Sequence, residues 1–295
     1  MIVAVTDEAP RIITRSGDPA ALPTGTLDPA LDRTLERALR RWVKEGPGLD
    51  LGYVEQLYTL GDRGRGADGD VRLVSVAYVA LIRERPAAAG SGAVWRDWYD
   101  LFPWEDWRAG RPAVVDAAIV PALDEWVEAA DGDDRVGRRE RSQIVFGLGG
   151  SSWDIERVLD RYELLWEIGF VPEAGADRHD DRVHGVPLVL DHRRIAAQAL
   201  ERIRGKLRYR PVVFELMADT FSLTGLQRVV EALSGVRIHA QNFRRLVDRG
   251  GLVEKTGGFD TGTGGRPAAL YRFRHEVLLE RPAPGVGLPG LRTSG

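Results

Sequence analysis

Apolar residues in the first part of the chain alternate with polar ones in short runs or recur at helical spacing. Helical spacing fills residues 30–44, where Asp28 is suited to cap the helix and Pro29 to occupy its first turn. A turn containing Pro10 separates the first two of four strand-like segments. These segments are residues 2–5, 11–14, 51–60 and 71–82. The order of the predicted elements is therefore strand, strand, helix, strand, strand.

Helical spacing returns in the middle of the chain, over residues 114–129, 138–146 and 154–168. A cluster of large rings precedes these helices: Trp95, Trp98, Tyr99, Phe102, Trp104 and Trp107. Such rings seal an irregular segment onto a core more often than they stack on a ligand, so we interpret them as core. An acidic, glycine-containing loop over residues 173–185 is the candidate domain boundary.

The last third of the chain predicts a connecting helix, a helix pair and a hairpin. The connecting helix covers residues 191–207, and Thr224 with Gln227 fits a capping box for the next helix. The two paired helices are residues 224–233 and 239–249, and two short strand patterns, residues 252–254 and 270–274, flank a Gly/Thr-rich tip at 257–266. A helix-turn-helix followed by a basic hairpin is typical of a winged helix.

Length and composition fit more than one folded domain. The 295 residues are 43% hydrophobic and 29% charged, as in soluble folded proteins. We predict an α+β fold in four parts: a sheet domain at residues 1–130, a helical extension and linker at 131–190, a winged helix at 191–282 and a flexible Pro/Gly-rich tail at 283–295. The absence of cysteine excludes disulfide scaffolds, Cys-ligated metal sites and thiol nucleophiles.

The net charge of −3 conceals an uneven distribution. Residues 192–274 carry sixteen Lys and Arg against seven Asp and Glu, which gives +9, so the remainder is strongly acidic. A basic C-terminal region favours a polyanionic partner. The sequence has no apolar run long enough to span a membrane, so we expect a cytoplasmic protein with no membrane partner.

The second helix of the predicted pair has side chains suited to reading DNA. Its apolar stripe faces the first helix, which leaves Gln241, Asn242, Arg244 and Arg245 outward. Asn and Gln can bond adenine edges, and Arg can bond guanine or phosphate. Arg266 in the hairpin tip is suited to phosphate or the adjacent minor groove. We therefore predict binding to double-stranded DNA, as a homodimer on a palindromic operator.

Three runs in this region resemble a known family: Lys206 to Leu216 (KLRYRPVVFEL), Gln241 to Leu246 (QNFRRL) and Gly265 to Phe273 (GRPAALYRF). They resemble the winged helix of the Nudix-related transcriptional regulators of NAD metabolism, the NrtR and NadQ type. The helical segment around residues 153–170 resembles the NadQ-type subgroup. The resemblance implies a Nudix-like α/β domain with a helical extension and a C-terminal winged helix-turn-helix. It also implies a repressor of NAD synthesis and salvage genes whose DNA affinity responds to a bound nucleotide.

The resemblance can be compared with the Nudix signature, in which four glutamates on a loop-helix-loop hold a divalent metal against a diphosphate. Aligning the end of the signature on residues 47–49 leaves Glu45 as a matching carboxylate. Arg33, Trp42 and Gly46 stand at the other three glutamate positions. With three of the four carboxylates absent, we expect no catalytic residue, no metal site and no hydrolysis of nucleoside diphosphates.

Nucleotide binding does not require those carboxylates. Residues 53–62 and 74–78 resemble the strands that follow the box in ADP-ribose-handling Nudix proteins. The predicted ligand-binding residues are Arg40 and Arg41 for phosphates, Tyr58 and Tyr78 for a base or ribose, and Glu45. We predict no required cofactor but an effector nucleotide, which the sequence leaves open among NAD, ATP and ADP-ribose.

Two other classes of protein fit the same residues. The first is an active Nudix-type hydrolase that rebuilds a metal site from carboxylates outside the box, such as Glu55, Glu84 or Asp62. The second is a protein-binding scaffold whose basic hairpin contacts an acidic partner. Absence of metal-dependent turnover excludes the first, and sequence-dependent DNA binding excludes the second.

Overall fold

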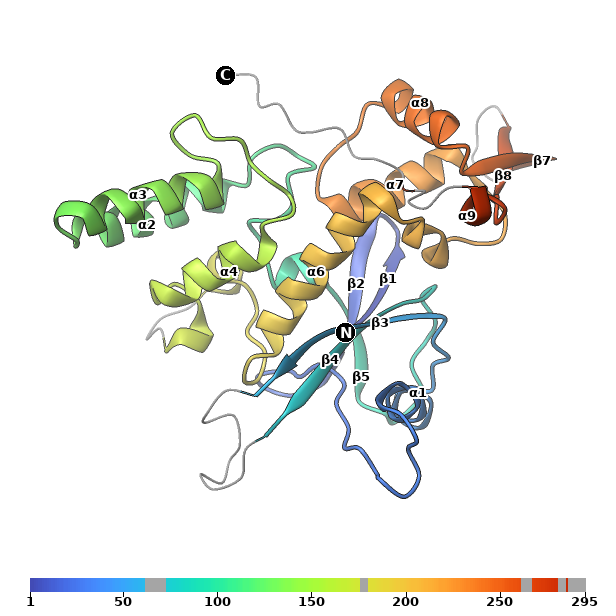
Figure 1. The fold of residues 1–295 in the computed structure, drawn as a ribbon, viewed down its shortest axis with the longest axis horizontal. Helices are drawn as coiled ribbons and strands as arrows, with labels where there is room; N and C mark the ends of the chain where they lie inside the picture. The colour runs from blue at the N-terminus through green and yellow to red at the C-terminus, as the bar shows by residue number, and fades with distance from the viewer. Residues whose placement is uncertain (62–72, 176–179, 261–266, 281–284, 286–295) are drawn as a thin grey trace.

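A five-stranded sheet in the order β3-β4-β1-β2-β5 forms the centre of the N-terminal half (Figure 1). The computed structural model describes residues 1–61, 73–175, 180–260, 267–280 and 285. β1 and β4 pair in parallel, and the other neighbours pair antiparallel. The strands are β1 (Ile2–Thr6), β2 (Ala9–Arg15), β3 (Tyr53–Leu60), β4 (Ser75–Leu81) and β5 (Ala93–Asp97).

Alternation along the strands gives this sheet two apolar faces, because successive side chains of a strand point to opposite sides. On one face, Ile2 and Ile13 pack with Val43 of helix α1 (Leu35–Glu45). On the other face, Val3 and Ile12 belong to the main core, which continues into the C-terminal helices. The sheet therefore lies between α1 on one side and the main core with the C-terminal helices on the other.

The first two strands are joined by Asp7 and Glu8, and the predicted turn around Pro10 is wrong. Both turn residues have positive φ, 50° for Asp7 and 63° for Glu8, as in the turns that suit two-residue hairpins. Pro10 lies within β2, opposite Val5 of β1. The sequence also gave no indication of β5, which pairs with β2 at the edge of the sheet.

Helix α1 begins five residues later than predicted. Thr34 is its N-cap, and the Thr34 hydroxyl accepts a hydrogen bond from the Arg37 amide at 3.2 Å. Asp28 and Asp32 form a separate turn, in which the Asp32 amide donates to the Asp28 carbonyl at 2.8 Å. Asp28 followed by Pro29 favours a turn as well as a helix start, and here the turn is formed.

The predicted aromatic core is confirmed, since Trp98, Phe102 and Trp104 are fully buried. The middle helices also exist, with shifted ends. This region consists of η1 (Trp98–Asp100), η2 (Val115–Ile119, a π-helix), α2 (Val120–Glu128), α3 (Gly132–Phe146), α4 (Val158–Glu167), η3 (Pro172–Ala174) and α5 (Asp181–His184). None of the helices in the described residues is long and apolar enough to cross a membrane.

The C-terminal part has the helix pair and hairpin that the sequence predicts. The N-cap of the first helix of the pair differs from the predicted capping box of Thr224 and Gln227. Ser222 is the cap and accepts from the Gly225 amide at 3.0 Å, while Gln227 donates to Glu231 and to the Ile238 carbonyl. The elements are α6 (His192–Tyr209), η4 (Val212–Leu216), β6 (Phe221–Ser222), α7 (Leu223–Ser234), α8 (Ala240–Gly250), β7 (Val253–Asp260), β8 (Ala268–Phe273) and α9 (Val277–Glu280).

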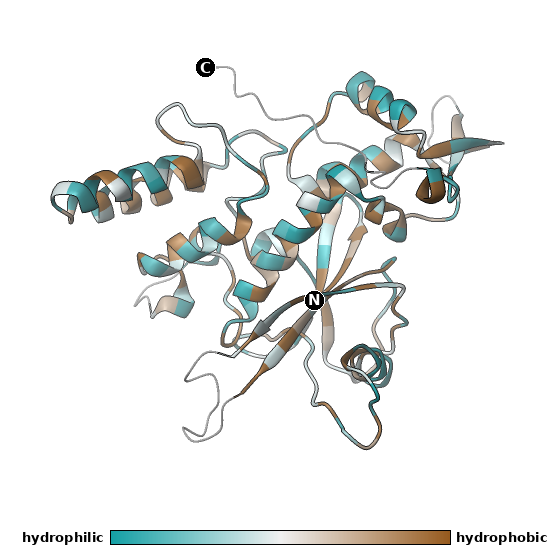
Figure 2. Cartoon of the chain, in the orientation of Figure 1, coloured by the Kyte–Doolittle hydropathy of each residue, from teal (hydrophilic) through white to brown (hydrophobic). Residues whose placement is uncertain are grey.

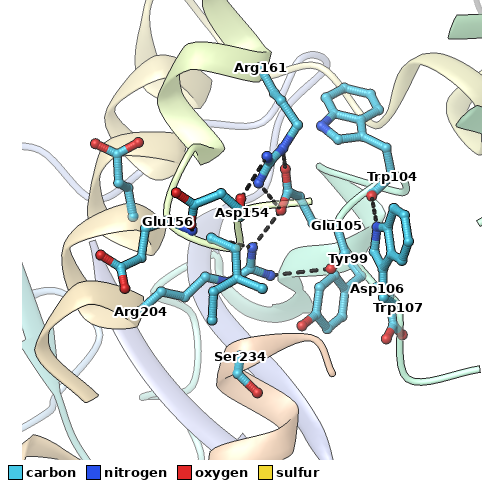
Figure 3. A network of polar contacts seen from close by, with 12 residues as sticks. Tyr99, Trp104, Glu105, Asp106, Trp107, Asp154, Glu156, Arg161, Arg204 and Ser234 are labelled. Atoms are coloured by element: carbon cyan, nitrogen blue, oxygen red, sulfur yellow. Dashed lines mark hydrogen bonds and ion pairs between the residues drawn. The ribbon is translucent and has the colours of Figure 1, made fainter. Parts of the chain in front are cut away.

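A buried carboxylate joins these parts of the chain (Figure 3). Glu105, in the segment after η1, accepts a hydrogen bond from Arg161 Nε of α4 at 2.6 Å and from Arg204 Nη1 of α6 at 2.5 Å. All three side chains are fully buried. Burial alone would raise the pKa of Glu105, but the charges and hydrogen bonds of the two arginines hold that pKa below its usual value.

We predict that Glu105→Gln lowers the free energy of unfolding by about 3–5 kcal/mol, because it leaves two buried guanidinium groups without a countercharge. Urea denaturation measures this loss. The control is Asp160→Asn, which removes an exposed ion pair with Arg157 and should change stability by at most about 1 kcal/mol. Equal effects of the two substitutions would contradict the role given to Glu105.

Candidate functional site

A cavity of about 230 Å³ lies between α1 and the sheet. Its apolar walls include Leu39 and Val43 of α1 and Ile2 of β1, and Tyr78 of β4 also lines it. The cavity occupies the side of the sheet that faces away from α6 and α7. An apolar hollow with a few polar groups is the usual form of a small-molecule site.

Two polar side chains of this cavity are absent from the predicted set. Arg15, at the end of β2, is exposed and has no carboxylate partner among the described residues. The indole Nε1–H of Trp42 is buried and has no hydrogen-bond partner among the same residues. A guanidinium and an indole N–H are both donors, so the cavity is suited to a ligand that presents acceptors.

The segment before α1 closes over Trp42. A Cβ at Gly25 would collide with the indole ring, so glycine is what allows this segment to lie against it. Pro23 and Thr24 from the same segment line the cavity. A tryptophan at a glutamate position of the Nudix box is the sequence signal for Trp42, whereas Arg15 had no signal, because the fold alone brings the end of β2 to α1.

Three of the predicted ligand-binding residues contact other parts of the protein instead. Arg40 pairs with Glu36 at 2.8 Å and donates to the Leu51 and Gly52 carbonyls. Arg41 donates to both oxygens of Asp32, at 3.0 and 2.6 Å, and pairs with Glu45 at 3.2 Å. None of the three lines the cavity. The contacts of Arg40 and Arg41 favour a role in holding α1 to its flanking segments, whereas Glu45 pairs with Arg41 within the helix.

The two predicted tyrosines are in different positions. Tyr78 lines the cavity, and its hydroxyl donates to Gln56 at 3.2 Å. Tyr58 lies on β3 with 48% of its surface exposed and does not line the cavity. The structure therefore brings Tyr78 alone of the five predicted residues to this cavity, beside Arg15 and Trp42.

Two of the three carboxylates proposed for a rebuilt metal site, Glu55 and Glu84, are already paired. Glu55 pairs with Lys206 at 2.8 Å and accepts from the Tyr53 hydroxyl, and Glu84 pairs with Arg11 at 3.5 Å. Asp62 lies outside the described residues. Among the residues that are described, no group of three His, Asp or Glu side chains could hold a metal ion. The described residues of the aligned Nudix signature therefore do not provide the group of oxygen ligands that a divalent cation needs.

The second candidate surface is the outer face of α8. Gln241, Asn242, Arg244 and Arg245 are exposed, as the apolar stripe predicts. Phe243 and Val247 are fully buried on the opposite face, and Figure 2 shows α8 as a largely hydrophilic helix. Arg245 donates to the Asn242 side chain at 2.5 Å. Arg266, in the hairpin tip, lies outside the described residues.

The total charge of +9 in the C-terminal region suggests many free basic side chains, but those of α6 are all paired with carboxylates. All Lys and Arg side chains of α6 pair with carboxylates of other segments: Arg193 with Glu173, Arg194 with Glu163, Arg202 and Lys206 with Glu55, Arg204 with Glu105, and Arg208 with Glu156. In contrast, Arg244 on α8 has no carboxylate partner within the described chain. Part of the +9 charge therefore holds the connecting helix in place, and Arg272 and Arg274 of the hairpin region are likewise paired, with Glu254 and Glu280.

The fold and these two surfaces define a class of protein, one in which a Nudix-like sheet domain is joined to a winged helix. Residues 213–273 match the family model of the NrtR DNA-binding winged helix domain. The crystal structure of Shewanella oneidensis NrtR in complex with a 27-mer DNA shares this fold, with a TM-score of 0.58 and 22% identity over 94% of this chain and 92% of that one. The predicted fold class is confirmed.

Two further proteins are similar to this chain, one in fold and one in sequence. A MutT/Nudix family protein from Enterococcus faecalis has a TM-score of 0.51 and 17% identity over 92% of this chain and 83% of that one. The ADPR-responsive transcriptional repressor NtrR of Acinetobacter baylyi is 38% identical over 86 residues, or 29% of this chain. The matched segment spans 34% of the length of that relative. The resemblance of this chain to Nudix-related regulators of the NrtR type is thus confirmed, and it is carried by the match of residues 213–273 to the NrtR winged helix domain.

The role of Arg41 can be tested through Asp32. Hydrogen bonds from Arg41 lower the pKa of Asp32 below its ordinary value of 3.8. We predict that Arg41→Ala raises the pKa of Asp32 toward 3.8 in an NMR titration of the free protein. The stabilisation from a depressed carboxyl pKa is present above about pH 4 and is lost as the pH falls through the folded-state pKa. The exposed Arg37→Ala serves as control, and an unchanged Asp32 pKa in Arg41→Ala would contradict the structural role.

Proposed function

We propose that this protein is a transcriptional regulator, in the sense of a repressor, whose DNA affinity is controlled by a nucleotide bound without hydrolysis in the cavity beside α1. The single observation that carries the proposal is the NrtR-type winged helix at residues 213–273 with its exposed reading face on α8. The regulated genes are those of NAD synthesis and salvage.

The DNA-binding part of the proposal rests on α8. Gln241 and Asn242 lie at the start of this helix, where groove-reading residues of helix-turn-helix proteins usually sit. The exposed Arg244 and Arg245 are suited to guanine or phosphate. Because one winged helix contacts few base pairs, the protein acts as a homodimer on a palindromic operator.

The effector is a nucleotide of the ADP-ribose class. The similarity to a repressor named for its response to ADPR supports this choice over ATP and NAD. Arg15 supplies a free positive charge for a diphosphate, the Trp42 indole N–H supplies a second donor, and Tyr78 offers a ring for a base or ribose. At about 230 Å³ the cavity is smaller than typical ligand pockets of about 300–1,000 Å³, so part of such a ligand extends beyond it.

The same site does not support hydrolysis. Nudix chemistry needs carboxylates that hold metal against the diphosphate. At two of the matching positions this chain has Trp42, on α1, and Gly46, the C-cap of that helix, and the remaining Glu45 is paired with Arg41. The protein is therefore a sensor of its nucleotide, and its binding requires no divalent cation.

We predict that wild-type protein binds its own promoter region more tightly than random duplex, with two chains per site. Gln241→Ala and Asn242→Ala should each cost about 1–3 kcal/mol on the promoter and less on random DNA. Arg266→Ala should weaken both and reduce the slope of log affinity against log salt by about one. Fluorescence titrations across salt measure these effects.

The control for these titrations is Arg139→Ala, which removes an exposed arginine on α3 that pairs with Glu128. Its affinity for DNA should match that of wild type. Equal wild-type affinity for promoter and random duplex, with or without nucleotide, would exclude the regulator and favour the protein-binding scaffold.

We also predict that Arg15→Ala weakens ADP-ribose binding about tenfold or more, because a hydrogen bond to a charged group contributes about 1.5–3 kcal/mol. Calorimetry in EDTA measures the affinity, and chromatography checks for AMP release with Mg²⁺ or Mn²⁺. Arg37→Ala, an exposed arginine of α1 outside the cavity, should bind as wild type does. Metal-dependent AMP release that disappears in Glu45→Gln or Glu55→Gln would replace the sensor with an enzyme.

A further inference from the structure

The β1–β2 hairpin extends from the cavity to the helix-turn-helix. At its open end, Met1, Ile2 and Arg15 line the cavity. At its closed end, Asp7 and Glu8 form the turn beside α7. Both strands are central in the sheet, and their register runs without interruption from Val3 opposite Ile12 to Thr6 opposite Ala9. A shift at one end of such a paired unit is carried to the other.

The turn contacts both parts of the helix-turn-helix through one side chain. The Glu8 carboxylate pairs with Arg228 of α7 at 3.3 Å and with Arg237 of the turn before α8 at 3.3 Å. Arg237 also pairs with Glu231 of α7 at 2.7 Å. Glu231 in turn accepts from the Ile238 amide at 2.9 Å, directly before α8. Glu8 is therefore linked by short contacts to the start of the reading helix.

The ion pairs of Glu8 with Arg228 and Arg237 are exposed to solvent, so they can break and re-form at little cost in free energy. The side chains of Glu8, Arg228 and Arg237 are 37%, 57% and 55% exposed, and a solvent-open groove separates Asp7 and Glu8 from Gly225 and Val229. Exposed ion pairs are weak, each changing an equilibrium by at most about fivefold. Two such pairs together change an equilibrium by at most about 25-fold, which lies within the five- to 150-fold range that is typical of coupling between two ligand sites.

We propose that the β1–β2 hairpin couples the effector cavity to the helix-turn-helix, with Glu8 as the contact through which α7 and the turn before α8 respond to the nucleotide. This inference rests on the proposed function above and specifies its regulation. Glu8 touches neither the nucleotide nor DNA, so it is a coupling residue, and its loss separates the two binding events without abolishing either.

The experiment measures the coupling factor, which is the ratio of promoter dissociation constants with and without saturating ADP-ribose. In Glu8→Gln we expect this factor to fall to below about twofold, while each ligand alone still binds. A second variant, Asp7→Asn with Glu8→Gly, removes the carboxylate but keeps residues that favour positive φ at both turn positions, so the hairpin is preserved. The control is Glu163→Gln, which makes the same change at a carboxylate paired with Arg194.

The outcomes separate this inference from the proposed function. A wild-type coupling factor of one contradicts the regulator itself, and the inference with it. Coupling in wild type that persists undiminished in both Glu8 variants overturns the inference alone. Coupling that is lost in both Glu8 variants and retained in Glu163→Gln supports it.

Discussion

Glu105 is the contact on which the arrangement of the whole chain depends. Its carboxylate is buried between Arg161 of α4 and Arg204 of α6, so it can be replaced only at the cost of two unpaired buried charges (Figure 3). Arg204 also donates to the Leu233 carbonyl at the end of α7. The Trp107 amide, two residues beyond Glu105, donates to Gly235 in the turn of the helix pair. The helical extension, the connecting helix and the first helix of the winged helix therefore share one fixed point.

This fixed frame is the background of the proposed coupling between a cavity on one face of the sheet and a helix on the other face. The main core runs without a break from the sheet through α6 and α7 to Phe243 and Val247 of α8. Against that rigid part, the turn at Glu8 is held by exposed ion pairs. Buried charges set the position of the helix-turn-helix, and in the proposed coupling the exposed charges around Glu8 adjust it. Such a division suits a protein whose two ligands must affect each other by a modest factor.

The sequence predicts those features that depend on local pattern. The apolar stripe with Phe243 identified α8 and its outward face, because helical periodicity is a local property. The sequence pattern misplaced the start of α1, because an aspartate such as Asp28 can begin a turn as well as cap a helix. The residue that caps α1 is Thr34. The sequence pattern also could not find the buried Glu105 or the cavity residue Arg15. Arginine and glutamate residues in a sequence normally indicate exposed positions. Most of the residues that surround Glu105 and Arg15 here are far from them along the chain, so no local pattern reveals these contacts.

The most direct test of the account is the reciprocity of the two binding events in wild-type protein. Calorimetry gives the ADP-ribose affinity of the free protein and of the protein saturated with promoter DNA, both in EDTA. The account predicts that DNA changes the nucleotide affinity by the same factor by which the nucleotide changes DNA affinity, at least about fivefold. Identical nucleotide affinities with and without DNA would contradict it.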